Sequence, residues 1–135
     1  IQSKKGWYDG IKFASQLEIY MYKQLQANDV EFGYETERFD IIDGFHSDNV
    51  SFERTATKDF INRGEKKIRG IYYTPDFVSE HWICETKGRA NESFPIRYKL
   101  FKRLLHLNND TRVLYKPQSK ADCDVAVKDI LKRFY

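Results

Sequence analysis

The segment 68–88 constrains this chain most, because two strand-like stretches in it carry three charged side chains at fixed spacing. Aromatic and β-branched residues dominate both stretches, and the polar residues 79–81 between them are typical of a tight turn. A turn centred between the second and third of these residues predicts an antiparallel hairpin with Asp76 directly opposite Glu85. Because side chains alternate along a strand, Lys87 then lies on the same face as both carboxylates.

Two carboxylates that face each other across a hairpin repel, which destabilises the pairing by a few tenths to about 1 kcal/mol. A cation bound between them removes this repulsion, so the pairing of Asp76 with Glu85 predicts a divalent metal ion. This prediction depends on the register, because a slip of one residue turns Glu85 to the opposite face of the sheet.

The remaining pattern predicts one domain, 1–135, of the α/β or α+β class with a mixed central sheet flanked by helices. Hydrophobic residues make up 41% of the 135 residues, which supports a core, and no apolar run has transmembrane length. Helices are expected over 15–27, 95–107 and 121–134. Strands are expected over 30–42, 71–78, 82–87 and 112–116.

Local signals refine the three helices. Ser15 and Glu18 have the spacing of a capping box, in which the glutamate reaches back to the Ser15 amide, and this explains Glu18 without any function. The last helix is expected to have Asp122 or Asp124 as its cap. In the middle helix, helical spacing predicts a buried stripe, with a basic outer surface around it. The expected stripe consists of Ile96, Leu100, Leu104 and Leu107.

Two segments have weaker patterns. Residues 1–12 are polar and basic, and they are expected to form an arm that either contacts a nucleic-acid backbone or frays as a terminus. Residues 43–70 contain turn signals, a short strand over 50–56 and a basic connector over 58–69, so a long hairpin or a flexible insertion is expected there.

Charge and cysteine content bear on partners and compartment. The formal net charge is +3, and the positive residues cluster, which allows phosphate binding although such runs are more often solvated faces. Cys84 and Cys123 lack the spacing of a zinc site or a disulfide framework, and no signal-peptide pattern is present. These features predict a cytoplasmic protein without membrane association.

A family motif joins the charged residues of the hairpin. Pro75-Asp76, eight further residues and then Glu85-Thr86-Lys87 match the PD-(D/E)XK nuclease motif. The chain also resembles a group of small phage-encoded proteins of this superfamily and, more distantly, the phage endonuclease I that resolves branched DNA. The matching blocks are D-G-I-K-F-x-S-x-L-E over 9–18, Y-T-P-D-F-V over 73–78, E-x-K-G over 85–88 and K-L-F over 99–101.

This resemblance implies a restriction-endonuclease-like core and a metal-dependent DNA endonuclease. In such a nuclease Asp76 and Glu85 bind the metal ion, the Thr86 carbonyl is a further ligand and Glu18 contributes from the first helix. Lys87 orients or activates the attacking water. Oxygen ligands without clustered His or Cys favour Mg²⁺, with Mn²⁺ as a substitute, and no small-molecule cofactor is expected.

Two features depart from the endonuclease I pattern. That enzyme has an acidic residue between the aromatics of its F-E-Y segment, where this chain has Gly33. Either Glu35 or Glu37 compensates, or the position is unfilled. The insertion 44–70 has no counterpart, so substrate recognition does not transfer from the resemblance.

The expected partner is DNA, bound by a homodimer because paired cleavage of two strands needs two active sites. Branched or junction DNA in recombination, inside the host cytoplasm, is the favoured substrate. The alternatives are a sequence-specific restriction, homing or transposition endonuclease, and a non-catalytic DNA-binding module on the nuclease fold. The candidates for DNA contact are Lys4, Lys5, Lys66, Lys67, Arg69, Arg89, Arg97, Lys99, Lys102 and Arg103.

Overall fold

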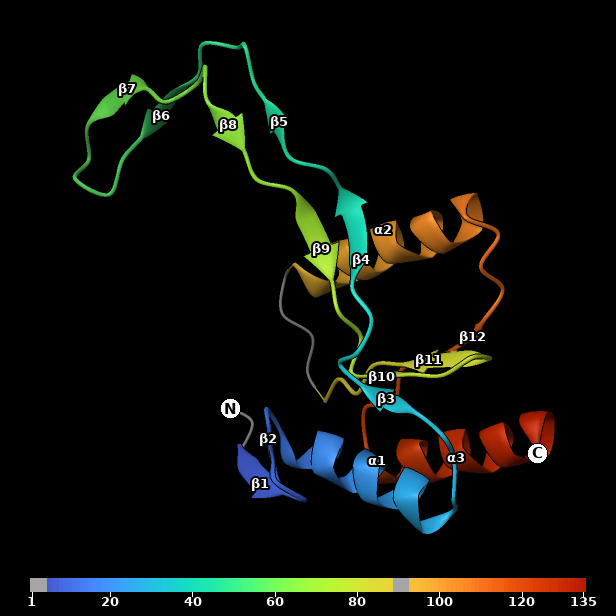
Figure 1. Ribbon diagram of the computed structural model, residues 1–135. Coiled ribbons are helices and arrows are strands. Elements are labelled where there is room, and N and C mark those ends of the chain that lie inside the picture. Colours follow the sequence, from blue (N-terminus) through green and yellow to red (C-terminus); the bar gives the residue numbers. More distant parts are fainter. Residues whose placement is uncertain (1–4, 89–92) are drawn as a thin grey trace. The chain divides into compact units, whose positions relative to one another are not determined.

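The computed structural model describes residues 5–88 and 93–135, and these form three helices and twelve short strands (Figure 1). The expected mixture of helices and strands is therefore confirmed as an α+β arrangement. The chain divides into two compact units. One unit combines Ile1–Arg38 with Thr74–Tyr135, and the other is Phe39–Tyr73.

A four-stranded sheet forms the centre of the first unit. Its order is β12 (Val113–Tyr115), β11 (Trp82–Cys84), β10 (Phe77–Val78) and β3 (Gly33–Tyr34). The pairs β3·β10 and β10·β11 are antiparallel, whereas β11 and β12 run parallel. The expectation of a mixed sheet is thus confirmed.

The hairpin has the register that the sequence predicts. Phe77 of β10 lies opposite Cys84 of β11, so the next residues outward, Asp76 and Glu85, face each other. The strands are shorter than expected, because the expected strand 71–78 is divided into β9 (Ile71–Tyr73) and β10. Pro75 lies in the gap and has no backbone N–H to donate to a ladder.

The expected strand 30–42 is also wrong as one continuous element. It divides into β3 and β4 (Phe39–Ile42), and Glu35 has a left-handed φ of +53° immediately after β3. A glutamate rarely adopts this conformation. The left-handed φ turns the chain away from the direction of β3. The Glu35 amide donates to the Asp76 carbonyl at 2.8 Å, which holds the bend against the hairpin.

Helix α1 (Gln16–Ala27) begins where the capping signal predicts. The Ser15 hydroxyl accepts a hydrogen bond from the Glu18 amide at 3.2 Å. Helix α3 (Lys120–Phe134) is capped differently from the prediction, because Ser119 is the cap and accepts from the Asp122 amide at 3.1 Å. The extended backbone of Ser119 suits this role, whereas Asp122 lies inside the first turn.

Helix α2 (Phe94–Leu107) begins one residue before the expected start and ends where expected, but its buried stripe differs from the prediction. Ile96 and Leu107 are exposed, with 65% and 56% of their surface accessible. The aromatic residues offer a second stripe at equally good helical spacing, and their larger apolar area is buried instead. The buried residues are Phe94, Tyr98, Phe101 and Leu105.

The core of the first unit lies between the sheet and the helices α1 and α3, which pack on each other. Phe13, Met21, Phe77, Trp82 and Ile130 are almost completely buried there. Helix α2 lies on the opposite side of the four-stranded sheet (Figure 1). Along the described part of the chain, no helix is long and apolar enough to cross a lipid bilayer.

The expected N-terminal arm is replaced by a hairpin of β1 (Gly6–Tyr8) and β2 (Ile11–Phe13). Asp9 and Gly10 form its turn with φ values of +53° and +74°, as their turn signal predicts. The Asp9 carboxylate accepts from the Tyr22 hydroxyl at 3.2 Å, which ties the turn to α1. The beginning of the basic segment 1–12 lies outside the described residues.

The second unit is a two-stranded ribbon of three successive antiparallel pairs. These are β4 with β9, β5 (Phe45–His46) with β8 (Lys67–Ile68), and β6 (Phe52–Arg54) with β7 (Phe60–Asn62). This ribbon is the long hairpin that the sequence allows. The stretch 58–69, expected as a connector, instead contains two of its strands.

Candidate metal centre

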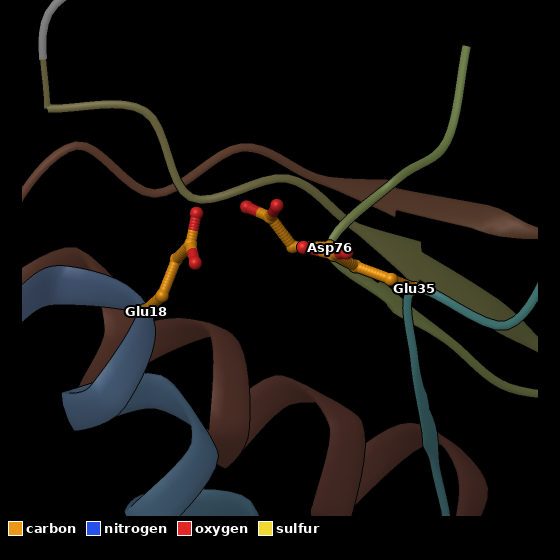
Figure 2. Close-up of side chains that lie close together, drawn as sticks. All are labelled: Glu18, Glu35 and Asp76. Carbon is orange, nitrogen blue, oxygen red and sulfur yellow. The ribbon is translucent and has the colours of Figure 1, made fainter. Parts of the chain in front are cut away.

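Three carboxylates from separate segments of the first unit converge on one point. Glu18 comes from α1, Glu35 from the bend after β3 and Asp76 from the segment before β10 (Figure 2). One carboxylate oxygen of each residue lies within 4.8 Å of the others. Glu18 and Asp76 are buried, whereas Glu35 is exposed. The group therefore combines two buried carboxylates with one that solvent reaches.

The Asp76 carboxylate is held in place by the hairpin itself. Its Oδ2 accepts hydrogen bonds from the Thr86 amide at 2.9 Å and from the Thr86 hydroxyl at 2.7 Å. The Asp76 amide in turn donates to Glu85 Oε1 at 3.2 Å. These three hydrogen bonds join Asp76, which precedes β10, to Glu85 and Thr86, which follow β11. They fix the orientation of the Asp76 side chain.

Burial raises the pKa of Asp76 well above its ordinary value, and the nearby Glu85 and Glu18 carboxylates raise it further. The two hydrogen bonds from Thr86 act in the opposite direction and do not outweigh these effects. A buried carboxylate surrounded by like charges favours either a proton or a cation. The arrangement fits a divalent ion, which would replace the proton on Asp76.

Glu18 has a different hydrogen-bond partner from the one that the capping box predicts. Its Oε2 accepts from the Ala14 amide at 3.2 Å instead of the Ser15 amide, and from the Tyr34 hydroxyl at 2.7 Å. Burial, followed by the Glu18 and Glu35 carboxylates, raises the pKa of Tyr34 far above its ordinary value. The phenol therefore stays protonated and acts as a donor within the acidic group.

We expect Tyr34→Phe to weaken the binding of Mg²⁺ or Mn²⁺ roughly 10-fold, because Glu18 loses the donor that orients it. The cost in stability should be about 1 kcal/mol, since the ring contacts with Phe13 and Phe77 remain. Isothermal titration calorimetry measures the affinity. Tyr20→Phe is the matched control, because it removes a 2.6 Å bond to the exposed Asp124. Unchanged metal affinity in Tyr34→Phe would contradict the role given to Tyr34.

Glu85 and Thr86 occupy positions beside the three carboxylates. Glu85 is buried, and its Oε1 accepts from the Asp76 amide, whereas Glu35 supplies the third carboxylate of the group. Glu85 remains close enough to be the largest electrostatic cause of the raised pKa of Asp76. The amide and hydroxyl of Thr86 hold Asp76. The ligand roles expected for the Glu85 carboxylate and the Thr86 carbonyl stay predictions.

The choice between Glu35 and Glu37, left open by the sequence, follows from the bend after β3. Glu35 turns toward Asp76, whereas Glu37 forms a 2.7 Å ion pair with Arg112. Arg112 also pairs with Asp110 at 2.7 Å. The positive φ of Glu35 places the Glu35 carboxylate, and not that of Glu37, in the group. No sequence pattern predicts this backbone conformation.

The comparisons with known proteins identify a family. The family model described as "Protein of unknown function (DUF1064)" matches residues 1–117, which include all three carboxylates. The chain belongs to the DUF1064 family. No curated protein and no solved structure matches it. The DUF1064 match therefore covers the whole acidic group and ends before α3.

Lys87 of this DUF1064 protein is half-buried, and its ammonium group is directed at an aromatic ring. Nζ lies 4.7 Å from the centroid of Phe94, and the Lys87 amide donates to the Pro117 carbonyl at 2.9 Å. Among the residues that the structure describes, Lys87 forms no ion pair with Asp76 or Glu85. Its expected action on the attacking water stays a prediction.

The basic residues expected to contact DNA are spread over several elements of the DUF1064 chain. Lys5 precedes β1 and is exposed, and three of the candidates lie on the ribbon of the second unit. On α2, Arg97 is half-buried and the other three candidates are exposed. Lys4 and Arg89 lie outside the described residues. The ribbon candidates are Lys66, Lys67 and Arg69, and the exposed α2 candidates are Lys99, Lys102 and Arg103.

Proposed function

We propose that this protein is a divalent-metal-dependent DNA endonuclease that hydrolyses phosphodiester bonds. The observation that carries the proposal is the convergence of Glu18, Glu35 and Asp76. Ligand oxygens on opposite sides of a Mg²⁺ ion are about 4 Å apart, so atoms within 4.8 Å of one another need only small movements to share one ion. The donor set contains oxygen alone, which suits Mg²⁺ or Mn²⁺.

The roles of the chain's own residues follow from this geometry. Asp76 supplies a carboxylate oriented by Thr86, Glu18 supplies one oriented by Tyr34, and Glu35 supplies the exposed third. A divalent ion bound there polarises the phosphate and lowers the pKa of a bound water. Glu85 adds negative charge next to Asp76, which strengthens the attraction of this point for a cation.

The PD-(D/E)XK motif supports the choice of a nuclease over other metal-dependent hydrolases. The motif residues Asp76, Glu85 and Lys87 lie on one hairpin, with Asp76 opposite Glu85 as the sequence predicts. A restriction-endonuclease-like core and a homodimer are part of the proposal. The favoured substrate is branched or junction DNA, because the resemblance includes a junction-resolving nuclease.

The test is a cleavage panel with a four-way junction, a matched duplex and a single strand. We expect cleavage in Mg²⁺ or Mn²⁺ and none with a chelator. Glu35→Gln should need a metal concentration at least roughly 10-fold higher, because one of three carboxylates is lost. Glu31→Gln is the matched control, since Glu31 is another exposed glutamate near β3 outside the group.

Each other outcome of the panel points to a different function. Cleavage that follows base sequence on duplex DNA would indicate a restriction, homing or transposition endonuclease. Binding of DNA without cleavage and without metal binding would indicate a non-catalytic module. Equal metal dependence in Glu35→Gln and Glu31→Gln would contradict the metal centre described above.

A further inference from the structure

Two stacked aromatic rings on α2 bring three lysines together in the first unit. The ring centroids of Phe94 and Tyr98 are 5.4 Å apart with an interplanar angle of 29°, and both residues are buried. Lys87 Nζ lies 4.7 Å from the Phe94 centroid. Nζ of Lys102 and Nζ of Lys116 lie 5.3 Å and 5.1 Å from the Tyr98 centroid. The three ammonium groups are therefore arranged along one ring pair.

Three separate segments contribute to this lysine row, which we define as Lys87, Lys102 and Lys116. Lys87 follows β11 and Lys116 follows β12, and these strands are parallel neighbours. The Lys87 amide bonds to the Pro117 carbonyl, which continues the pairing beyond the strand ends. Lys102 comes from α2, one turn after Tyr98. The tertiary fold, and not a run in the sequence, creates the row.

The ammonium groups of the lysine row have no direct ion-pair partner among the described residues, 5–88 and 93–135. Like charges gathered in this way repel one another, and a bound polyanion removes the repulsion. The ring faces position the ammonium groups, while each group keeps N–H donors for another acceptor.

The row begins next to the candidate metal centre. Lys87 is two residues after Glu85, which lies opposite Asp76 in the hairpin. Burial raises the pKa of Tyr98 to about 12, and the Cys84 thiol and the Glu85 carboxylate contribute to this increase. Tyr98 is therefore within electrostatic reach of Glu85. A nucleic-acid strand bound along the row would therefore pass near Glu85.

We propose that the lysine row binds successive backbone phosphates of the nucleic-acid strand that enters the metal centre. The inference rests on the proposed nuclease function for its substrate. It adds Lys116, which basic runs in the sequence did not single out, and it selects Lys102 from the basic residues of α2. The alternative is that the lysine side chains only cover the aromatic rings. In that case the affinity for DNA would not depend on these lysines.

The experiment measures binding of a fluorescein-labelled oligonucleotide without metal, by anisotropy over a range of KCl concentrations. We expect the double variant Lys102→Gln/Lys116→Gln to bind about 10-fold more weakly. The slope of log K against log salt should fall in magnitude by roughly 1.4 for a single strand, because two phosphate contacts are lost. The affinity for Mg²⁺, measured by calorimetry, should be unchanged.

Two control variants test whether the change in salt slope is specific to the lysine row. Lys128→Gln/Lys132→Gln removes the same charge from exposed positions on α3 and should leave the salt slope unchanged. Lys102→Arg/Lys116→Arg keeps the charge and should keep the slope. An unchanged slope in the Lys102→Gln/Lys116→Gln protein, or an equal loss in the α3 variant, would overturn the proposal. Thermal melting verifies that all variants are folded.

The outcomes separate the row from the nuclease proposal. If the protein binds DNA with the expected change in slope but cleaves no DNA with Mg²⁺, the row stands as a nucleic-acid site and the endonuclease is wrong. If it cleaves DNA while the Lys102→Gln/Lys116→Gln protein binds and cleaves like the wild type, the endonuclease stands and the row is wrong. Absence of all DNA binding overturns the row as well.

Discussion

Replacing Asp76 by Asn is expected to slow metal-dependent DNA cleavage by roughly 10³-fold, because the central ligand loses its charge and the site loses several kcal/mol of transition-state stabilisation. Asn has nearly the same shape, and its side-chain oxygen still accepts from the Thr86 amide and hydroxyl. The fold should therefore be retained. Single-turnover cleavage of the preferred DNA at saturating Mg²⁺ measures the effect.

The control for this experiment is Asp29→Asn. Asp29 is exposed, and its left-handed φ of +55° suits asparagine, so the same chemical change is made without strain. We expect this variant to cleave at the wild-type rate. Cleavage by Asp76→Asn at a rate close to that of wild type would rule out Asp76 as a metal ligand. It would also contradict the proposed metal-dependent mechanism.

The stability of the metal-free protein is expected to fall as the pH rises from about 5 to about 9. The pKa of Asp76 is raised from 3.8 to about 9 in the folded state, mainly by burial and then by Glu85 and Glu18. Between these values the folded protein binds a proton that the unfolded chain has released. The free energy of unfolding therefore decreases with pH, by at most about 1.4 kcal/mol per pH unit.

Other carboxylates with shifted pKa values do not act in this window. The pKa values of Asp110 and Asp129 are lowered, chiefly by hydrogen bonds from Arg112 and Arg133. A lowered pKa contributes stability that is lost only as the pH falls through that lower value. The pH dependence between 5 and 9 is therefore dominated by Asp76 among the groups with a described shift.

Thermal melts at several pH values, with and without Mg²⁺, test this expectation. Mg²⁺ at 100 times its dissociation constant should stabilise the wild type by about 2.7 kcal/mol, because it binds only the folded state. Asp76→Asn should show a flatter pH dependence, higher stability than wild type at pH 9 without metal, and little response to Mg²⁺. Parallel pH curves for the two proteins would contradict the assignment of the effect to Asp76.

The sequence by itself was sufficient for features that depend on neighbouring residues. The register that places Asp76 opposite Glu85 follows from a short turn and the two-residue period of strands, both of which are local. The start of α1 follows from Ser15, whose hydroxyl satisfies an amide three residues later. The existence of all three helices and of the mixed sheet is likewise predicted from periodicity and element order.

Other local choices were not decided by pattern alone. In α2, two stripes have acceptable helical spacing, and the rest of the fold buries Phe94 and Tyr98 while leaving Ile96 exposed. The strand expected over 30–42 ends early because Glu35 adopts a positive φ. Periodicity describes which faces a segment can bury, but the surface available to it is built by distant residues.

The composition of the candidate centre was decided by tertiary structure. The sequence indicated Asp76, Glu85, the Thr86 carbonyl and Glu18 as ligands. It left open whether Glu35, Glu37 or no residue fills the remaining acidic position, and the fold placed Glu35 in the group with Glu18 and Asp76. The bend after β3 and the helix start of α1 meet the hairpin only in three dimensions. The lysine row arises in the same way, since Lys116 and Lys102 are brought to one aromatic pair by a strand and a helix. The packing of the surrounding apolar residues determines which charged side chains, distant in sequence, lie close together. Local sequence patterns do not contain that information.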